Sequence, residues 1–202
     1  MSSDRYITLA QRSEDVFREK ASKFIGIGFP VRNEEEYKKI LATIVRDHHR
    51  ARHFCYAWVL GATGERHRAV DAGEPSGTAG QPIRRQLRAR SLTDAAVVVV
   101  RYFGGTLLGK AGLVRAYSEA AHLALEAGRM EERVLFDRFV VECTHAQFEA
   151  LKTLLAALDG NVIETHYEAL CTLVVEVPKG SRTHFLAHCE RHGLAVQDQF
   201  PK

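Results

Sequence analysis

Sequence signatures of several enzyme classes and of membrane proteins are absent from this chain. No apolar run approaches the roughly 20 residues that a helix needs to cross a bilayer. The chain also lacks the Gly-Lys-Ser/Thr ending of a Walker A loop, the Gly-x-Gly-x-x-Gly dinucleotide pattern and the Gly-x-Ser-x-Gly nucleophile elbow. These absences argue against a membrane-spanning protein, a P-loop nucleotidase, a standard NAD enzyme and an α/β-hydrolase.

Cysteine pairs with the spacing of a metal site are absent as well. The four cysteines form no Cys-x-x-Cys pair, and three of them lie in apolar, strand-like runs; they are Cys55, Cys143, Cys171 and Cys189. Residues 1–23 are polar and mixed in charge, unlike the apolar core of a secretory signal. We therefore expect a cytoplasmic protein whose thiols are reduced and mostly buried.

Histidines do not complete a metal site either. His184, His188 and His192 are spaced by four residues on a predicted helix. Two such side chains can share one ion, but the third lies too far along the helix axis, and no carboxylate pattern completes the set. The sequence predicts neither a bound metal nor a cofactor.

Charge is distributed unevenly along a chain that is otherwise typical of globular proteins, with 46% hydrophobic and 26% charged residues. Residues 1–129 contain 21 Lys and Arg against 14 Asp and Glu, a net +7, whereas residues 130–202 contain 7 against 11, a net −4. Between residues 84 and 115 there are seven basic residues and a single acid, Asp94. Chance asymmetry on solvated faces is one interpretation; two units with different roles is the other, and we favour it.

The first 129 residues predict an α+β domain. Strands are expected at 22–31, around Phe17, at 53–60 and at 66–71, with a fully buried strand at 95–102. Asn33 and Glu36 form a capping-box pattern at the start of a helix. Its expected buried stripe is Tyr37, Ile40, Leu41, Ile44 and Val45. Pro82 suits the first turn of a short basic helix at 83–90, and a longer helix is expected at 111–127.

Residues 128–133, a glycine followed by charged residues without periodicity, are the expected domain boundary. Beyond them the order is strand (134–143), helix capped by Thr144, hairpin (161–167 and 170–177), helix capped by Ser181, and strand (194–200). This βαββαβ order predicts a ferredoxin-like domain over residues 134–202.

Two glycine-rich loops are the candidate functional segments. The first, at 71–82, offers main-chain amides, Ser76 and Thr78 as an anion site beside the next helix, with a tight structural turn as the alternative. The second, at 101–113, follows a buried strand and precedes a helix, with Arg101, Lys110 and Arg115 as cations. Tyr102, Phe103 and Tyr117 are candidates to stack on bases, with core packing as the alternative. The glycines expected to shape these loops are Gly73, Gly77, Gly80, Gly104, Gly105, Gly109 and Gly112.

Both loops, together with the segment Arg52-His53-Phe54-Cys55-Tyr56-Ala57-Trp58, resemble the IMPACT family in its bacterial YigZ-like branch. The resemblance extends over about residues 22–127 and includes Asp71-Ala72-Gly73-Glu74-Pro75 and Arg101-Tyr102-Phe103-Gly104-Gly105. It departs from the family pattern at Ala72, where Asp is usual, and at Ala111, where Gly is usual. The missing acid counts against an enzyme that depends on it.

The resemblance implies a fold for each domain and a function connected with translation. The first domain is expected to look like the second domain of a small-subunit ribosomal protein and domain four of elongation factor G, and the second domain like domain five of that factor. The family is linked to translation. Eukaryotic members use an additional N-terminal domain that this chain lacks, so we do not carry their regulatory role over.

Three functions follow from these features. The leading hypothesis is a non-catalytic RNA- or ribosome-binding protein connected with translation. The second is a regulator that docks a protein partner through its acidic C-terminal domain. The third is an enzyme acting on an anionic small molecule, with Glu74 as acid or base and Arg101 as anion clamp; it requires both side chains to face one open pocket. The expected nucleic-acid or anion contacts are Arg52, His53, Ser76, Thr78, Arg84, Arg85, Arg88, Arg101, Tyr102, Phe103, Lys110 and Arg115.

Overall fold

The computed structural model describes residues 4–199 and divides them into two compact units. The N-terminal unit runs from Tyr6 to Arg133, and the C-terminal unit contains Asp4, Arg5 and the chain from Val134 onwards. The segment expected to be an irregular boundary instead contains strand β7 (Met130–Val134), which pairs with β1 (Arg5–Leu9). Neither strand is evident locally, because each is defined by a partner more than a hundred residues away.

A five-stranded antiparallel sheet forms the centre of the N-terminal unit. Its spatial order is β2 (Ser13–Glu19), β3 (Ser22–Pro30), β6 (Ala95–Tyr102), β4 (His53–Leu60) and β5 (Arg66–Val70). Residues 95–101 of the central strand are buried. The prediction of a strand covered on both faces is therefore confirmed.

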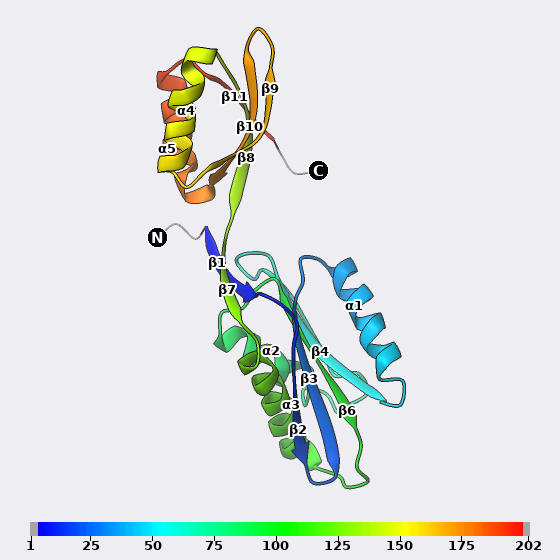
Figure 1. Cartoon of the computed structure of the whole chain (residues 1–202). Helices are drawn as coiled ribbons and strands as arrows, with labels where there is room; N and C mark the ends of the chain where they lie inside the picture. The colour runs from blue at the N-terminus through cyan, green and yellow to red at the C-terminus, as the bar shows by residue number, and fades with distance from the viewer. Residues whose placement is uncertain (1–3, 200–202) are drawn as a thin grey trace. The chain divides into compact units, whose positions relative to one another are not determined.

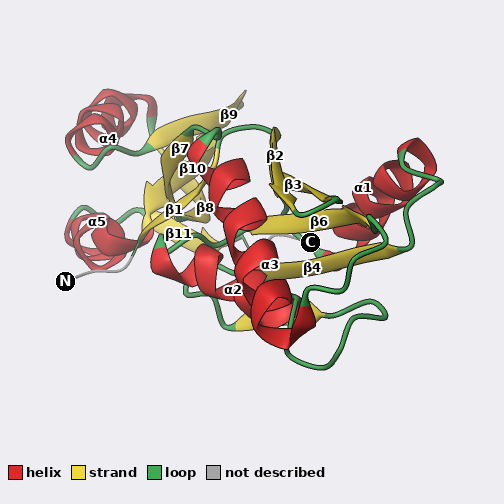
Figure 2. Ribbon diagram, turned by 90° about the horizontal axis from the view of Figure 1, so that it is seen from below, coloured by secondary structure: helices red, strands yellow, loops and turns green. Residues whose placement is uncertain are grey.

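Helices cover both faces of this sheet (Figures 1 and 2). α1 (Glu34–Asp47) packs on one face, and α2 (Gly80–Ala89) and α3 (Gly109–Glu126) pack on the other. The alternation along β4 matches this arrangement: Trp58 lies in the core beneath α1, whereas Cys55 and Ala57 lie in the core beneath α2 and α3. The predicted single face for the larger β4 side chains is confirmed.

The start of α1 follows the predicted capping pattern in part: Asn33 caps the helix, but the Glu36 side chain bonds the Arg32 amide and not the Asn33 amide of a full capping box. The Asn33 side chain accepts a hydrogen bond from the Glu36 amide at 2.9 Å, and the Glu36 carboxylate accepts one from the Arg32 amide at 2.8 Å. The expected buried stripe is too wide by one residue, because Val45 is 40% exposed. Its neighbour Ile44 faces the sheet, and adjacent helical residues point about 100° apart.

The C-terminal unit has a four-stranded antiparallel sheet in the order β11 (Ala195–Asp198), β8 (Phe136–Cys143), β10 (Cys171–Pro178) and β9 (Asn161–Tyr167). Two helices, α4 (His145–Ala157) and α5 (Arg182–Arg191), pack with it around Phe139, Leu151 and Phe185. This is the ferredoxin-like arrangement that the element order predicts. The likeness of both units to parts of elongation factor G stays a prediction.

The capping predictions in this unit have different outcomes. Thr144 closes a full capping box with Gln147 at the start of α4. Ser181 makes no side-chain cap, because a single 3-10 turn (Lys179–Ser181) leads directly into α5. The last predicted strand ends at Asp198, and Phe200 lies outside the described residues.

All four cysteines are free and buried, as predicted. Within residues 4–199, no helix combines the length and the apolar character that crossing a membrane requires.

Replacing Thr144 with alanine is expected to destabilise α4 by about 1 kcal/mol, because the hydrogen bond that the Gln147 amide donates to the Thr144 hydroxyl is lost. Amide hydrogen exchange along α4 measures this locally. Thr153→Ala is the matched control in the same helix: its hydroxyl bonds only the Glu149 carbonyl within the helix, and alanine has the higher helix propensity. Equal protection of the α4 amides in both variants would contradict the role of Thr144 as the helix cap.

Candidate functional site

Strand register gathers three distant segments at one end of the N-terminal sheet. Lys23 on β3 pairs with Tyr102 on β6, and His53 on β4 pairs with Arg101. The β2–β3 turn, the start of β4 and the end of β6 are therefore neighbours. We define the basic end as residues 18–23, 48–53 and 101–115, which contain eight Lys and Arg and a single acid, Glu19.

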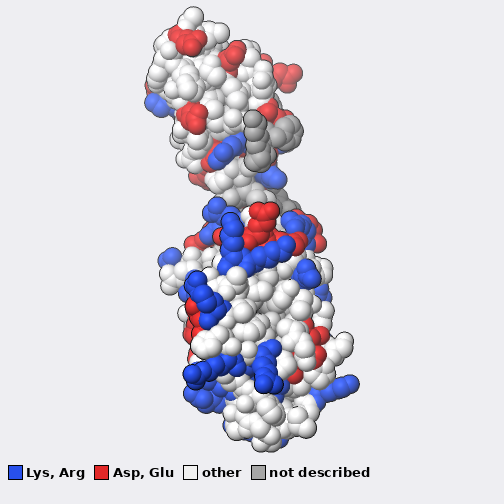
Figure 3. Space-filling model, turned by 90° about the vertical axis from the view of Figure 1, so that its right-hand side faces the viewer, with Lys and Arg blue, Asp and Glu red and all other residues white. Residues whose placement is uncertain are grey.

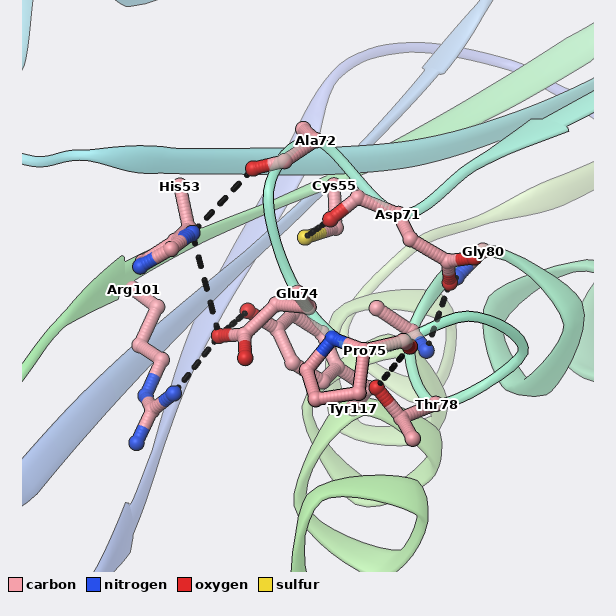
Figure 4. Close-up of polar contacts among 11 residues, drawn as sticks. His53, Cys55, Asp71, Ala72, Glu74, Pro75, Thr78, Gly80, Arg101 and Tyr117 are labelled. Atoms are coloured by element: carbon pink, nitrogen blue, oxygen red, sulfur yellow. Dashed lines mark hydrogen bonds and ion pairs between the residues drawn. The ribbon is translucent and has the colours of Figure 1, made fainter. Parts of the chain in front are cut away.

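A buried carboxylate occupies the inner side of the basic end (Figure 4). Oε1 of Glu74 accepts a hydrogen bond from Nη1 of Arg101 at 2.6 Å and another from the Tyr117 hydroxyl at 2.8 Å. The side chains of Glu74 and Arg101 are only 4% and 6% exposed. Nδ1 of His53 lies 4.0 Å from the same oxygen. One carboxylate thus joins the first glycine loop to β6 and α3.

This ion pair corrects the roles predicted for Arg101 and Glu74. Arg101 lies on the same face of β6 as Val97 and Val99, which pack beneath α2 and α3, so its guanidinium points into the unit. The enzyme hypothesis required Glu74 and Arg101 to face one open pocket. They instead contact each other in the interior, and Arg101 is not placed as an external phosphate clamp.

Aromatic rings enclose the Arg101 guanidinium. Its central carbon lies 5.3 Å from the ring centroid of Phe24 and 5.3 Å from that of Phe103, within the range of cation–π attraction. Nε of Arg101 is buried and has no hydrogen-bond partner within residues 4–199. Phe24 is fully buried, whereas Phe103 is 54% exposed, so this stack extends from the core to the surface.

The amides of the first loop are occupied by Asp71. Oδ1 of Asp71 accepts from the amides of Ala79 and Gly80 at 2.9 and 2.8 Å, and Oδ2 accepts from the Gly77 amide at 2.9 Å. Burial alone would raise the pKa of Asp71, but the three amide bonds outweigh it and lower that pKa. The expectation that these amides are free for an external anion is wrong, because the chain supplies its own.

The two hydroxyl groups predicted as anion ligands in this loop differ in their environment. Thr78 is 3% exposed and its hydroxyl donates to the Pro75 carbonyl at 2.6 Å, while Ser76 is exposed. Gly80 must be glycine, because a Cβ there would overlap the backbone of Val70. The tight structural turn, the alternative left open for this loop, describes it better.

Ala72, the departure from the family pattern, has a structural role through its backbone. Its φ of 43° lies in the left-handed region, and its carbonyl lies 3.1 Å from Nδ1 of His53, so that nitrogen carries the proton. Cys55 similarly donates its thiol hydrogen to the Asp71 carbonyl at 2.9 Å. Burial raises the pKa of Cys55 to about 12, so this thiol stays protonated and is not a reactive nucleophile.

The second loop projects from the basic end. The Gly104 amide donates to the Ser22 hydroxyl at 3.2 Å, and a Cβ at Gly104 would overlap the backbone of Ala21 and Ser22. Lys20 donates to the Leu107 carbonyl at 3.3 Å. Of the predicted loop glycines, positive φ angles occur at Gly73, Gly77, Gly105 and Gly109. Gly112 lies inside α3 and not in the loop, and the neighbouring Ala111 is exposed there.

The predicted aromatic contacts separate into three cases. Tyr117 is fully buried, so the core-packing alternative holds for this residue and its ring is not available for stacking. The Tyr102 hydroxyl lies 3.0 Å from Nδ1 of His48 and the residue is partly buried. Phe103 presents its ring at the surface, and Leu107 in the same loop is 82% exposed.

The predicted cations fall into two groups. Arg52, Lys110 and Arg115 are exposed at the basic end, where Arg115 pairs with Glu19 at 2.5 Å. Arg85 and Arg88 are exposed on α2, which packs along α3, whereas Arg84 is partly buried and its Nε has no partner within residues 4–199. Sequence reasoning missed Arg18, Lys20 and Lys23, because only the strand register places the β2–β3 turn beside the second loop.

The histidines of α5 form no metal centre with other side chains in the described part of the chain. The rings of His188 and His192 are 4.3 Å apart between centroids. Burial lowers the pKa of His188, and the neighbouring His192, Arg191 and His184 lower it further.

Glu74→Gln is expected to destabilise the N-terminal unit by about 3–5 kcal/mol, because it leaves the Arg101 guanidinium buried without a counter-charge. Urea unfolding followed by the fluorescence of Trp58, the sole tryptophan, reports on this unit. Glu19→Gln removes the same kind of partner from Arg115, which is 67% exposed, and is expected to cost at most about 1 kcal/mol. Similar losses in the two variants would refute the buried pair.

Asp71 is expected to make stability fall in acid. Because its folded pKa lies below its unfolded value, its contribution is complete above about pH 4 and is lost as the pH falls through the folded pKa. Asp71→Asn should therefore show a shallower decline of unfolding free energy below about pH 4 than the wild type. Glu35→Gln on the exposed side of α1 is the control, and a slope for Asp71→Asn as steep as the wild-type slope would argue against this role.

Comparisons with known proteins agree with this architecture. The family model for the Impact N-terminal domain matches residues 20–125, which include both glycine loops and all of the basic end except Arg18 and Glu19. The IMPACT family member YigZ of Escherichia coli (strain K12) is 34% identical over 170 residues, covering 83% of each chain. An IMPACT family member of Haemophilus influenzae is 33% identical over 173 residues, covering 84% of each chain.

A solved structure supports the fold over the whole length. A crystal structure described as that of a hypothetical protein superposes with a TM-score of 0.71 at 31% identity, covering 98% of this chain and 99% of the other. The family model and the two bacterial relatives together show that the chain belongs to the IMPACT family, in its YigZ-like branch.

Proposed function

We propose that the protein binds RNA, free or within the ribosome, through the basic end of its N-terminal unit, in a role connected with translation. Membership of the IMPACT family relates the chain to translational regulation. The observation that carries the proposal is the surface charge of the basic end: with Arg101 neutralised inside by Glu74, seven Lys and Arg remain against one acid, Glu19. Figure 3 shows Lys and Arg around an uncharged tip at the lower end of this unit, and further Lys and Arg beside Asp and Glu at its upper end.

The cations available to RNA differ from those that support the fold. Lys20, Arg52 and Lys110 are exposed around the second loop, whereas Arg101 is held inside by Glu74. Flexible, solvated cations neutralise phosphates and release counterions. Binding should therefore depend steeply on salt, with each phosphate contact contributing about 0.7 to the slope of log affinity against log salt for a single strand.

The α2 arginines lie on the side of the sheet that α2 and α3 cover, outside the basic end. Arg85 and Arg88 are exposed on α2, and α2 is tied to α3 by the hydrogen bond from Gln86 to Ser118 at 2.7 Å. They are secondary contacts in this proposal, because they lie away from the exposed aromatic loop. Docking of a protein partner on the acidic C-terminal unit stays an alternative, to be separated by nuclease treatment before a pull-down.

The triple variant Lys20→Ala/Arg52→Ala/Lys110→Ala is expected to weaken RNA binding and to lower the salt slope by about 2, one increment of about 0.7 for each lost phosphate contact. Fluorescence anisotropy of a labelled RNA across a salt series measures both quantities. The control Arg32→Ala/Lys38→Ala/Lys39→Ala removes the same charge from exposed positions at and near the start of α1 and should leave the slope nearly unchanged. No RNA binding by the wild type, or equal effects of the two triples, would refute the proposal.

A further inference from the structure

We propose that the basic end selects unpaired RNA, by stacking one nucleobase on the exposed face of Phe103; this inference rests on the RNA-binding function proposed above. Of the aromatic residues at or beneath the basic end, Phe103 has the ring most open to solvent. Phe24 and Tyr117 are fully buried, and the Tyr102 hydroxyl bonds His48.

Phe103 is exposed but fixed from below. Its ring lies over the Arg101 guanidinium at 5.3 Å, and that guanidinium is held by Glu74 at 2.6 Å and backed by Phe24 at 5.3 Å. Glu74 is in turn held by the Tyr117 hydroxyl at 2.8 Å. A ring supported in this way loses little freedom when a base stacks on it, so the platform is organised before RNA arrives.

The surroundings of Phe103 suit a nucleic acid strand. Gly104 and Gly105 follow it and carry no side chains that would hold a backbone away, and nothing lies near the position of a Cβ on Gly105. Lys20 bonds the Leu107 carbonyl, Lys110 follows the loop in the chain, and Arg52 precedes the His53–Arg101 pair; these exposed cations can meet the phosphates beside a stacked base. An aromatic platform with flanking cations is the common arrangement of proteins that bind single strands.

Unpaired bases are favoured over a duplex because of the geometry of the platform. Bases inside a duplex already stack on each other and offer their faces only at the ends. The single ring of Phe103 on a small glycine loop offers a face and no base-edge hydrogen bonds. We therefore expect preference for unpaired strands with little sequence selectivity.

The competing interpretation of this loop is membrane insertion, since Phe103 and Leu107 are both exposed and apolar, and cations flank them. The two residues differ in what holds them: the Phe103 ring lies over the buried Arg101 guanidinium, whereas the exposed Leu107 side chain has no cation–π partner of this kind among the described residues. Stacking requires Phe103 alone, whereas insertion into lipid would use both.

The test compares binding of a short oligoadenylate containing 2-aminopurine with binding of an RNA duplex of equal length. Phe103→Leu keeps an apolar cover over Arg101 but has no aromatic face. It is expected to weaken binding of the single strand about tenfold and to abolish the quenching of 2-aminopurine, with little change for the duplex. Phe103→Trp keeps an aromatic face and should match the wild type in both single-strand affinity and 2-aminopurine quenching. Leu107→Ala, the matched control in the same loop, should also resemble the wild type.

The outcomes separate this inference from the proposed function. If the wild type binds neither RNA, the proposed function fails. If it binds RNA with the salt dependence of the basic end, but Phe103→Leu binds the single strand like the wild type, only the stacking inference fails. Binding to vesicles of phosphatidylserine and phosphatidylcholine that needs both Phe103 and Leu107, without RNA binding, would overturn it in favour of a lipid surface. Thermal melting of each variant confirms that the fold is kept.

Discussion

The carboxylate of Glu74 is the constraint on which the N-terminal unit depends. Burying a charge is costly unless a partner and hydrogen bonds compensate for it, and here Arg101 and Tyr117 both supply them to a single oxygen. The three groups come from a loop, a central strand and a helix, so their meeting fixes the relative positions of all three. The aromatic ring at the surface is held by the same pair, which connects the stability of the interior with the shape of the outer face.

The glycine loops also separate internal from external charge. Asp71 fills the amides that resemble an anion site, and Glu74 neutralises Arg101, which points inward. What is left at the surface is a set of cations with little negative charge nearby. A motif rich in glycine and arginine therefore has two parts. The inner residues hold the loops in shape, and the outer residues make the surface positively charged.

Much of the fold follows from the sequence, because it rests on local patterns. The cap at Asn33, the alternation along β4, the apolar run of β6 and the βαββαβ order all lie within short windows. The site follows less well, since it depends on register between distant strands. Nothing local places Lys20 beside Leu107, or pairs β1 with β7. The inward direction of Arg101 is an exception, because the sequence alone predicts it. In a strand, Arg101 lies on the same face as Val97 and Val99, and this alternation is better evidence of its direction than the basic residues that follow it.

The path of the chain between the two units has a consequence of a different kind. The polypeptide enters the N-terminal unit at Tyr6 and leaves it at Arg133, on the neighbouring strands β1 and β7. The unit therefore has the topology of an insert, with its entry and exit side by side. Such a unit can be expressed on its own or exchanged for that of another family member. A short linker between its two ends would also allow a circular permutation. Pulling on its two ends would also load the β1–β7 ribbon before the central sheet.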